Sequence, residues 1–195
     1  MVVLAADHWP TNAELIADCH RLGYIKDDDK VLDATYGRGV WWKQWRPDDL
    51  MPHAGDFMSL PYADQSFDVA TFDPPYVSVG GRKTSTLDDF NDRYGLHQTP
   101  SGPTALQMVI NDGLSAVSAK VKPRGIVLVK CMDYVTSGKL WLGTHYTLTH
   151  ALNFLNMEAV DRMEHVGRPR PQPSGRRQVH ARRNLSTLFV LRNPK

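Results

Sequence analysis

Short apolar runs alternate along this chain with longer segments in which apolar residues recur every three or four positions. Runs with a period of two predict strands, and the longer period predicts helices. Strands are expected at residues 30–35, 50–54, 66–72, 126–131, 158–166 and 185–191, and helices at 13–22, 40–45, 104–121 and 137–155. This alternation predicts an α/β fold, in which a mostly parallel sheet is covered by helices on both faces.

Two prolines end the strand expected at residues 66–72. The segment beyond it reads Asp73, Pro74, Pro75 and Tyr76. Each proline fixes its φ angle and removes a backbone donor, so the chain leaves the sheet stiffly at this point. Ligands of open α/β sheets bind beyond the carboxyl ends of the strands. We therefore expect a ligand site at this carboxylate and aromatic ring, with a proline turn that has no function as the alternative.

The loop after the first strand, residues 33–39, reads Asp-Ala-Thr-Tyr-Gly-Arg-Gly. Gly37 and Gly39 allow the backbone to pass close to a ligand where a side chain would collide. Asp33, at the end of the strand, can bind a cationic or amine-bearing ligand. The third glycine of the dinucleotide-binding fingerprint is absent. A nucleotide-type ligand loop and a structural turn are both compatible with these residues.

Two further segments have open interpretations. Trp41, Trp42 and Trp45 fall within five residues, and they either wall a ligand pocket or pack a short helix. Residues 77–103 are rich in Gly, Ser, Thr, Asp and Pro and show little periodicity, which is typical of a functional or mobile loop. We expect a mobile, substrate-facing loop whose Arg82 and Lys83 meet phosphates, with simple surface disorder as the alternative.

The charge is distributed unevenly. The net charge is +2, but the last acidic residue is Glu164, and eight Lys or Arg follow it. Residues 167–183 alone contain six arginines, three prolines and no acid. Prolines keep such a connection extended, and arginine forks suit phosphates and guanine edges. The segment therefore predicts a nucleic-acid contact loop, with a solvated basic edge as the alternative.

Composition excludes several classes of protein. The 195 residues are enough for one domain with a sizeable core. No apolar run has the length of a membrane span, and the first residues lack the pattern of a signal peptide, so a cytoplasmic protein is expected. Cys19, Cys131 and the eight histidines show no metal-site spacing, so no metal is expected.

The proline segment at 73–76 resembles the Asp-Pro-Pro-Tyr motif of S-adenosylmethionine-dependent DNA amino-methyltransferases, which methylate adenine N6 or cytosine N4. Residues 33–39 resemble the cofactor loop of that family, Asp-x-x-x-Gly-x-Gly. Residues 55–68 are similar to its Gly-Asp-x-x-x-Leu-Pro-x-x-Asp-x-Ser-Phe-Asp run. Residues 180–184, His-Ala-Arg-Arg-Asn, are similar to a run near the end of some small DNA methyltransferases.

The resemblance implies a Rossmann-like class I methyltransferase fold over residues 1–195, as a single domain without a separate target-recognition domain. The family fold usually has a terminal antiparallel strand, which 158–166 and 185–191 would supply as a hairpin-like end. One departure concerns the second strand, which the family follows with an acid for the cofactor ribose and then a helix. Here no acid clearly ends residues 50–54, His53 or Asp56 lies near the expected position, and the helix is missing.

The expected site residues form three groups. The catalytic group is Asp73, Pro74, Pro75 and Tyr76. The group that binds S-adenosylmethionine is Asp33, Ala34, Thr35, Tyr36, Gly37, Gly39, Asp56, Phe57 and Asp73, with Asp56 near the adenine ring. The group that binds nucleic acid is Arg82, Lys83, Arg168, Arg170, Arg176, Arg177, Arg182 and Arg183. Lys130 and Asp133 are expected near the pocket end of the strand 126–131.

The implied chemistry is methylation of an amine that is delocalised into a base. Asp73 and the Pro74 carbonyl can accept its N–H groups, and Tyr76 can stack on a flipped base. Carbon-5 methylation of cytosine would need a cysteine thiolate at the pocket, and neither cysteine follows the required pattern. The first Asp of the motif favours adenine N6 in this family. Methylation of an RNA base, such as guanine N2, and an inactive nucleic-acid-binding subunit are the alternatives. Selectivity is expected to come from the two loops, residues 77–103 and 167–183, from a homodimer or from a partner subunit.

Overall fold

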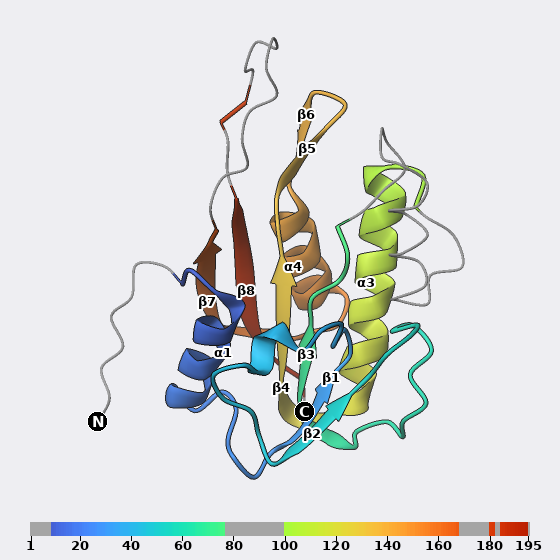
Figure 1. The fold of residues 1–195 in the computed structure, drawn as a ribbon. Helices are drawn as coiled ribbons and strands as arrows, with labels where there is room; N and C mark the ends of the chain where they lie inside the picture. The colour runs from blue at the N-terminus through green and yellow to red at the C-terminus, as the bar shows by residue number, and fades with distance from the viewer. Residues whose placement is uncertain (1–8, 77–99, 168–179, 182–183, 195) are drawn as a thin grey trace.

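The computed structural model describes residues 9–76, 100–167, 180–181 and 184–194. A central sheet separates two helical layers (Figure 1). The elements are α1 (Asn12–Arg21), β1 (Lys30–Asp33), the 3-10 helix η1 (Val40–Trp42), β2 (Asp49–Pro52), β3 (Phe67–Phe72), α3 (Pro103–Lys120), β4 (Val121–Cys131), β5 (Tyr134–Thr136), β6 (Lys139–Trp141), α4 (Gly143–Asn153), β7 (Glu158–Val166) and β8 (Leu185–Arg192). Within this part of the chain, no helix combines the length and the apolar character needed to cross a lipid bilayer.

The six strands of the main sheet lie in the order β2-β1-β3-β4-β8-β7. β1, β2, β3 and β4 pair in parallel, whereas β8 is antiparallel to both β4 and β7. The predicted parallel sheet with a terminal antiparallel strand is therefore confirmed. Because β8 runs against its neighbours, the carboxyl ends of β1, β3, β4 and β7 all lie at the same edge of the sheet.

The strands are apolar on both faces because helices cover both. On β1, Val31 faces the layer that contains α1, and Leu32 faces the layer that contains α3 and α4. β4 repeats this alternation, with Leu128 packed in the first layer and Val127 in the second. Side chains of a strand point to opposite faces in turn, so the near-continuous apolar runs fill two cores at once.

Local signals fix both ends of α1. The hydroxyl Oγ1 of Thr11 accepts a hydrogen bond from the backbone N of Glu14 at 3.2 Å, which makes Thr11 the N-cap. Beyond Arg21 the chain turns at Gly23, whose φ of +79° lies in the left-handed region that glycine tolerates. The helix predicted at 13–22 is thus confirmed to within one residue at each end.

Two helix predictions need correction. The helix predicted over 137–155 begins only at Gly143, because Ser137 and Gly138, with φ of 47° and 74°, turn the chain into the β5–β6 hairpin. The helix predicted at 40–45 is reduced to η1, a 3-10 turn of three residues. The expected absence of a second helix is confirmed, since residues 53–66 contain turns and no helix.

Candidate active site

Polar side chains gather where β1, β3 and β4 end. Asp33 is the last residue of β1, Asp73 directly follows β3, and Lys130 is the penultimate residue of β4. Asp33 and Lys130 come two residues after Val31 and Leu128, which face the α1 layer, so their side chains lie on that face too. The sheet therefore presents two carboxylates and an ammonium group together at its carboxyl edge.

Asp33 is almost fully buried, with 4% of its surface exposed. Its Oδ1 accepts a hydrogen bond from Thr35 N at 3.1 Å, and its Oδ2 accepts one from Trp42 Nε1 at 2.7 Å. Burial raises the pKa of Asp33 to about 6, although both hydrogen bonds favour the ionised form. Asp33 therefore carries a negative charge at neutral pH in a place where few carboxylates stay ionised.

The first loop and the proline motif are joined directly. Asp73 N donates a hydrogen bond to Thr35 Oγ1 at 2.8 Å, and Ala34 N donates one to Thr71 O at 3.0 Å. Ala34 and Thr35, expected to contact a cofactor, thus connect β1 to β3. The two predicted motifs lie side by side although 38 residues separate Thr35 from Asp73.

The glycine loop has glycines in the left-handed region, and Gly39 lies against Tyr36 of the same loop. Gly37 and Gly39 have φ angles of 55° and 62°, in the left-handed region. A Cβ atom on Gly39 would lie 2.5 Å from the hydroxyl oxygen of Tyr36. The positive φ angle of Gly39 therefore favours glycine, and a side chain at this position would also have to displace the Tyr36 ring.

The proline motif is anchored to β4 by its first and last residues. Lys130 Nζ lies 3.5 Å from Asp73 Oδ2, and Tyr76 OH donates a hydrogen bond to Lys130 O at 2.6 Å. Burial raises the pKa of Tyr76 well above its ordinary value, so the phenol stays neutral and remains a donor. Pro74 and Pro75 are buried, whereas 29% of the Asp73 side chain is exposed. Solvent can therefore reach parts of Asp73 and Tyr76, but not the two prolines between them.

The segment after β2 contains a partly exposed acid, Asp56, and a buried core residue, Phe57. Asp56 is partly exposed, and its Oδ1 accepts a hydrogen bond from Met58 N at 2.8 Å. Phe57, expected to contact the cofactor, is fully buried, and its ring packs edge-on against Phe72 with the centroids 5.1 Å apart. The structure therefore places Phe57 in the core between the sheet and α3.

No acid ends β2. The strand finishes at Pro52, and His53 N donates a hydrogen bond to Asp33 O at 2.9 Å. Asp56 comes three residues after His53, and its carbonyl oxygen lies 3.3 Å from His53 Nε2. Asp56 is thus the first acidic side chain beyond the end of this strand.

The three tryptophans at positions 41, 42 and 45 pack against neighbouring residues, and one of them also positions Asp33. Trp41 and Trp42 are buried against the α1 layer, and Trp42 also donates to Asp33. Trp45 stacks on His20 with the ring centroids 4.0 Å apart. Core packing is therefore the better interpretation of the tryptophan cluster, and the support of Asp33 by Trp42 is an addition that the spacing did not predict.

His165 is a residue near the site that the sequence did not single out. Its Nδ1 lies 2.7 Å from Trp9 O. Burial lowers the pKa of His165 below its ordinary value, and the Lys130 ammonium lowers it further, while the Trp9 carbonyl and Asp73 oppose this change. The ring is therefore neutral at neutral pH. The period of two that places Met163 in the α1 layer also places His165 on that face, and this is the signal that could have identified it.

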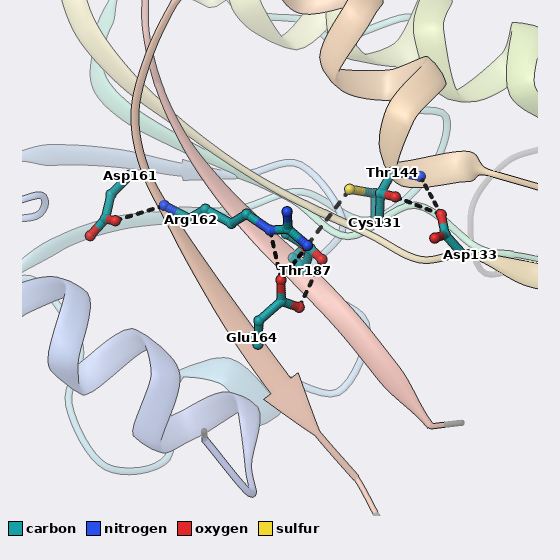
Figure 2. Close-up of polar contacts among 7 residues, drawn as sticks. All are labelled: Cys131, Asp133, Thr144, Asp161, Arg162, Glu164 and Thr187. Carbon is teal, nitrogen blue, oxygen red and sulfur yellow. Dashed lines mark hydrogen bonds and ion pairs between the residues drawn. The ribbon is translucent and has the colours of Figure 1, made fainter. Parts of the chain in front are cut away.

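On the opposite face of the sheet, a second polar cluster braces β4, β8 and β7 (Figure 2). Glu164 accepts hydrogen bonds from Arg162 Nε at 2.6 Å and from Thr187 Oγ1 at 2.9 Å. Cys131 Sγ lies 3.7 Å from Thr187 O, and burial raises the pKa of this thiol. Cys131 is therefore a neutral core thiol and not a nucleophile.

Asp133, expected near the pocket, serves α4 instead. Its Oδ1 accepts hydrogen bonds from Thr144 N at 3.0 Å and from Thr144 Oγ1 at 2.5 Å (Figure 2). These bonds satisfy an amide in the first turn of the helix. Lys130 is confirmed beside the site, whereas Asp133 is committed to a structural contact.

The predicted nucleic-acid contacts lie outside the described residues. These are Arg82, Lys83, Arg168, Arg170, Arg176, Arg177, Arg182 and Arg183. In the part of the chain that the structure describes, no three His, Cys, Asp or Glu side chains form a group that could hold a metal ion.

No protein-family model matches the sequence, and no curated protein matches it significantly. Among solved structures, a putative methyltransferase from Bacillus halodurans C-125 is 13% identical, aligns over 92% of this chain and 99% of its own, and has a TM-score of 0.53. The cyclase SpnF is 13% identical and aligns over 97% of this chain and 89% of its own, with a TM-score of 0.53.

A putative DNA modification methylase from Thermus thermophilus is 12% identical and aligns over 73% of this chain and 53% of its own, with a TM-score of 0.49. The present chain thus spans about half the length of that methylase. The fold described above is the Rossmann-like class I methyltransferase fold, as predicted. Since a cyclase has a similar fold, the fold does not define the reaction, and the site must do so.

Proposed function

We propose that this protein is an S-adenosylmethionine-dependent DNA amino-methyltransferase that methylates the exocyclic amine of a flipped base, with adenine N6 as the preferred target. The observation that carries this proposal is the placement of Asp73. The Asp73 side chain is partly exposed, and the residue directly follows the inner strand β3. Its backbone N donates a hydrogen bond to Thr35 in the loop after β1. This is the arrangement that the resemblance to the Asp-Pro-Pro-Tyr family requires.

The residues present fit the cofactor by charge. Asp33, Asp56 and Asp73 come from the segments at the ends of β1, β2 and β3, which are neighbouring strands. S-adenosylmethionine carries a sulfonium and an ammonium group, and opposite charges attract strongly in partly buried sites. When bound, it supplies a methyl group made electrophilic by the sulfonium to which it is attached. Asp33, with its buried charge, is the residue we assign to the cationic part of the cofactor.

Asp73 and its neighbours act on the amine. The amine nitrogen of a base is a weak nucleophile because its lone pair is delocalised into the ring. Hydrogen bonds from its N–H groups to Asp73 and to the Pro74 carbonyl favour a tetrahedral nitrogen with a free lone pair. As the N–C bond forms, the methyl–sulfur bond of the bound cofactor would break and leave a neutral thioether, and the nitrogen loses a proton to the carboxylate or to solvent. Positioning of the two reacting atoms supplies most of the acceleration.

Tyr76 acts through its ring. Its hydroxyl is bonded to Lys130 O, so the phenol is held in one orientation. Stacking of a flipped base on an aromatic ring contributes roughly 1–3 kcal/mol. Flipping costs a few kcal/mol, so stacking offsets much of this cost.

DNA is the proposed partner because arginine forks suit phosphates and because the motif resemblance is to DNA enzymes. Six arginines fall within residues 167–183. Selectivity comes from this segment and from residues 77–103, with a second copy or a partner subunit as a further source. Charge reversal by Arg176→Glu and Arg177→Glu is expected to weaken DNA binding, most strongly at low salt. Unchanged affinity in a filter-binding titration would remove this segment from the interface.

One observation favours a second candidate, an inactive nucleic-acid-binding subunit of the same fold. β2 ends at Pro52 and His53 without the acid that the family uses for the cofactor ribose. Calorimetry on the isolated chain separates the two candidates, because an inactive subunit is expected to bind little S-adenosylmethionine.

The experiment that tests the main proposal is transfer of a labelled methyl group to duplex DNA, single-stranded DNA and total RNA, followed by nucleoside analysis. N6-methyldeoxyadenosine is the expected product. N4-methyldeoxycytidine would retain the mechanism and change the base. Label in RNA alone would transfer the proposal to RNA bases, and the absence of label in any nucleic acid would overturn it.

A further inference from the structure

One residue of β4 holds both ends of the proline motif. The side chain of Lys130 reaches Asp73, with Nζ 3.5 Å from Oδ2, while its backbone carbonyl accepts the hydrogen bond from Tyr76 OH at 2.6 Å. The first contact is ionic and the second is a neutral hydrogen bond. Substitution of the Lys130 side chain removes the first contact and leaves the second.

The ammonium group of Lys130 is nearly withdrawn from water, since 10% of its side chain is exposed. Removing an ammonium from water is costly unless a carboxylate lies close to it. Among the described residues, Asp73 is the ion-pair partner of this lysine. The pair differs from a fully exposed salt bridge, because 10% of the Lys130 side chain and 29% of the Asp73 side chain are exposed.

The ion pair also orients Asp73. Asp33 places a second carboxylate nearby, and the negative charge of Asp73 is one of the causes that raise the pKa of Asp33. An ammonium beside Oδ2 offsets this repulsion and limits rotation of the carboxylate. In the described part of the chain, no hydrogen bond reaches Oδ1 of Asp73, so this oxygen is available to a substrate.

We infer that Lys130 is a positioning residue for methyl transfer, which fixes the Asp73 carboxylate so that one oxygen faces the amine of the target base. This inference rests on the proposed function. It assigns to Lys130 no contact with the base or the cofactor. Its effect is on the geometry of Asp73, and a misplacement of about 1 Å in such a group can reduce a rate by about 10²-fold.

Removal of the ammonium also has an opposing effect. The amine gains positive charge as the N–C bond forms, and a nearby ammonium disfavours that charge. Positioning is expected to dominate, because a carboxylate that rotates away loses its hydrogen bond to the amine entirely. The negative charge of Asp73, 3.5 Å from the ammonium, also reduces this repulsion.

The test compares wild-type protein with Lys130→Met, Lys130→Arg and Lys120→Met. Methionine keeps most of the length of the lysine side chain and removes its charge, whereas arginine keeps the charge. Lys120 is the matched control, because its side chain is 17% exposed and its Nζ lies 2.6 Å from Asp64 Oδ1 at the opposite edge of the sheet. The readouts are kcat and KM for methyl transfer to DNA, the Kd for S-adenosylmethionine by calorimetry, and the melting temperature.

For Lys130→Met we expect kcat to fall by about tenfold or more, with KM for DNA and Kd for the cofactor changed less than about threefold. Lys130→Arg is expected to recover most of kcat, and Lys120→Met to keep kcat within about twofold. The inference is overturned if Lys130→Met keeps its kcat, if Lys130→Arg is as slow as Lys130→Met, or if cofactor affinity and melting temperature fall together with kcat. A wild-type protein that methylates no nucleic acid would instead overturn the proposed function.

Discussion

Aspartates at the two edges of the sheet have pKa values that are shifted in opposite directions. At the amino end of β3, Asp68 accepts hydrogen bonds from Lys122 Nζ at 2.6 Å and from Lys30 N at 3.0 Å. Partial burial opposes ionisation of Asp68, but these contacts outweigh it and lower its pKa. At the carboxyl end of β1, burial dominates and raises the pKa of Asp33 to about 6.

The difference separates Asp68, which has a close cation, from Asp33, whose two hydrogen-bond donors are neutral, and from Asp73, whose side chain is partly exposed. Asp68 has a close cation and a backbone donor, so its negative charge is already satisfied. At the carboxyl edge, the ammonium of Lys130 lies 3.5 Å from Asp73, and Asp33 forms no ion pair with a described residue. An excess of buried negative charge is unfavourable until a cationic ligand arrives, and such groups are typical of functional sites.

The largest effect on methyl transfer is expected from substitution of Asp73. Asp73→Ala removes the acceptor of the amine N–H, so kcat for methyl transfer should fall by about 10²- to 10⁴-fold. Cofactor affinity should change little, because Asp33 keeps its charge. Labelled methyl transfer and calorimetry measure the two quantities. Asp68→Ala is the control at the other edge and should keep its kcat, and full activity in Asp73→Ala would contradict the mechanism.

The next effect concerns Asp33 and pH. Its raised pKa means that the folded protein binds a proton as pH falls through about 6, so the affinity for a cationic cofactor should fall there. Asp33→Asn should bind the cofactor about tenfold more weakly at neutral pH, by loss of a charged contact. It should also lose this pH dependence. Calorimetry between about pH 5 and pH 8 measures both effects.

Asp68→Asn provides the control for this pH series, since it should bind the cofactor as wild type does at every pH. A wild-type affinity that stays constant across the range would show that Asp33 does not contact the cationic part of the cofactor. Equal losses of cofactor affinity in Asp33→Asn and Asp68→Asn would show that the two edges of the sheet do not differ in cofactor binding.

The smallest effect is expected at the amino edge. Lys122 is 46% exposed and its partner Asp68 is 34% exposed, so solvent screens their ion pair. Lys122→Ala should lower the free energy of unfolding by at most about 1 kcal/mol, measured by urea denaturation. Methyl transfer should be unchanged. A loss of activity comparable with that of Lys130→Met would mean that ion pairs at both edges matter equally.

The sequence predicted the strands well for a physical reason. Each inner strand is buried on both faces, so it needs an apolar run whatever its neighbours are. The helix predicted at 137–155 was wrong in its first part because residues 137–142 form the turn and second strand of a hairpin, in which Leu140 pairs with Val135. The left-handed turn at Ser137 and Gly138 decided between a helix and a hairpin.

The site was predictable only as far as local motifs reach. Residues 33–39 and 73–76 were identified from their own sequence, and the structure joins them through Thr35 and Asp73. The contact of Asp73 with Lys130 depends on strand order, which no local pattern contains. Phe57 was expected at the cofactor site but is fully buried, because a motif match does not tell which residue of a turn faces the core.

The antiparallel direction of β8 has a consequence for how this protein can change. Val166 at the end of β7 pairs with Leu185 at the start of β8, and Gly167 N donates a hydrogen bond to Asn184 O at 2.8 Å. The arginine-rich segment between them therefore leaves and re-enters the sheet at one closed pair of strand ends, on the same rim as Asp33 and Asp73. The pairs at Val166–Leu185 and Gly167–Asn184 fix the register of the two strands next to this segment. Under the proposed function, target preference and methyl-transfer chemistry can therefore evolve as separate modules of one small protein.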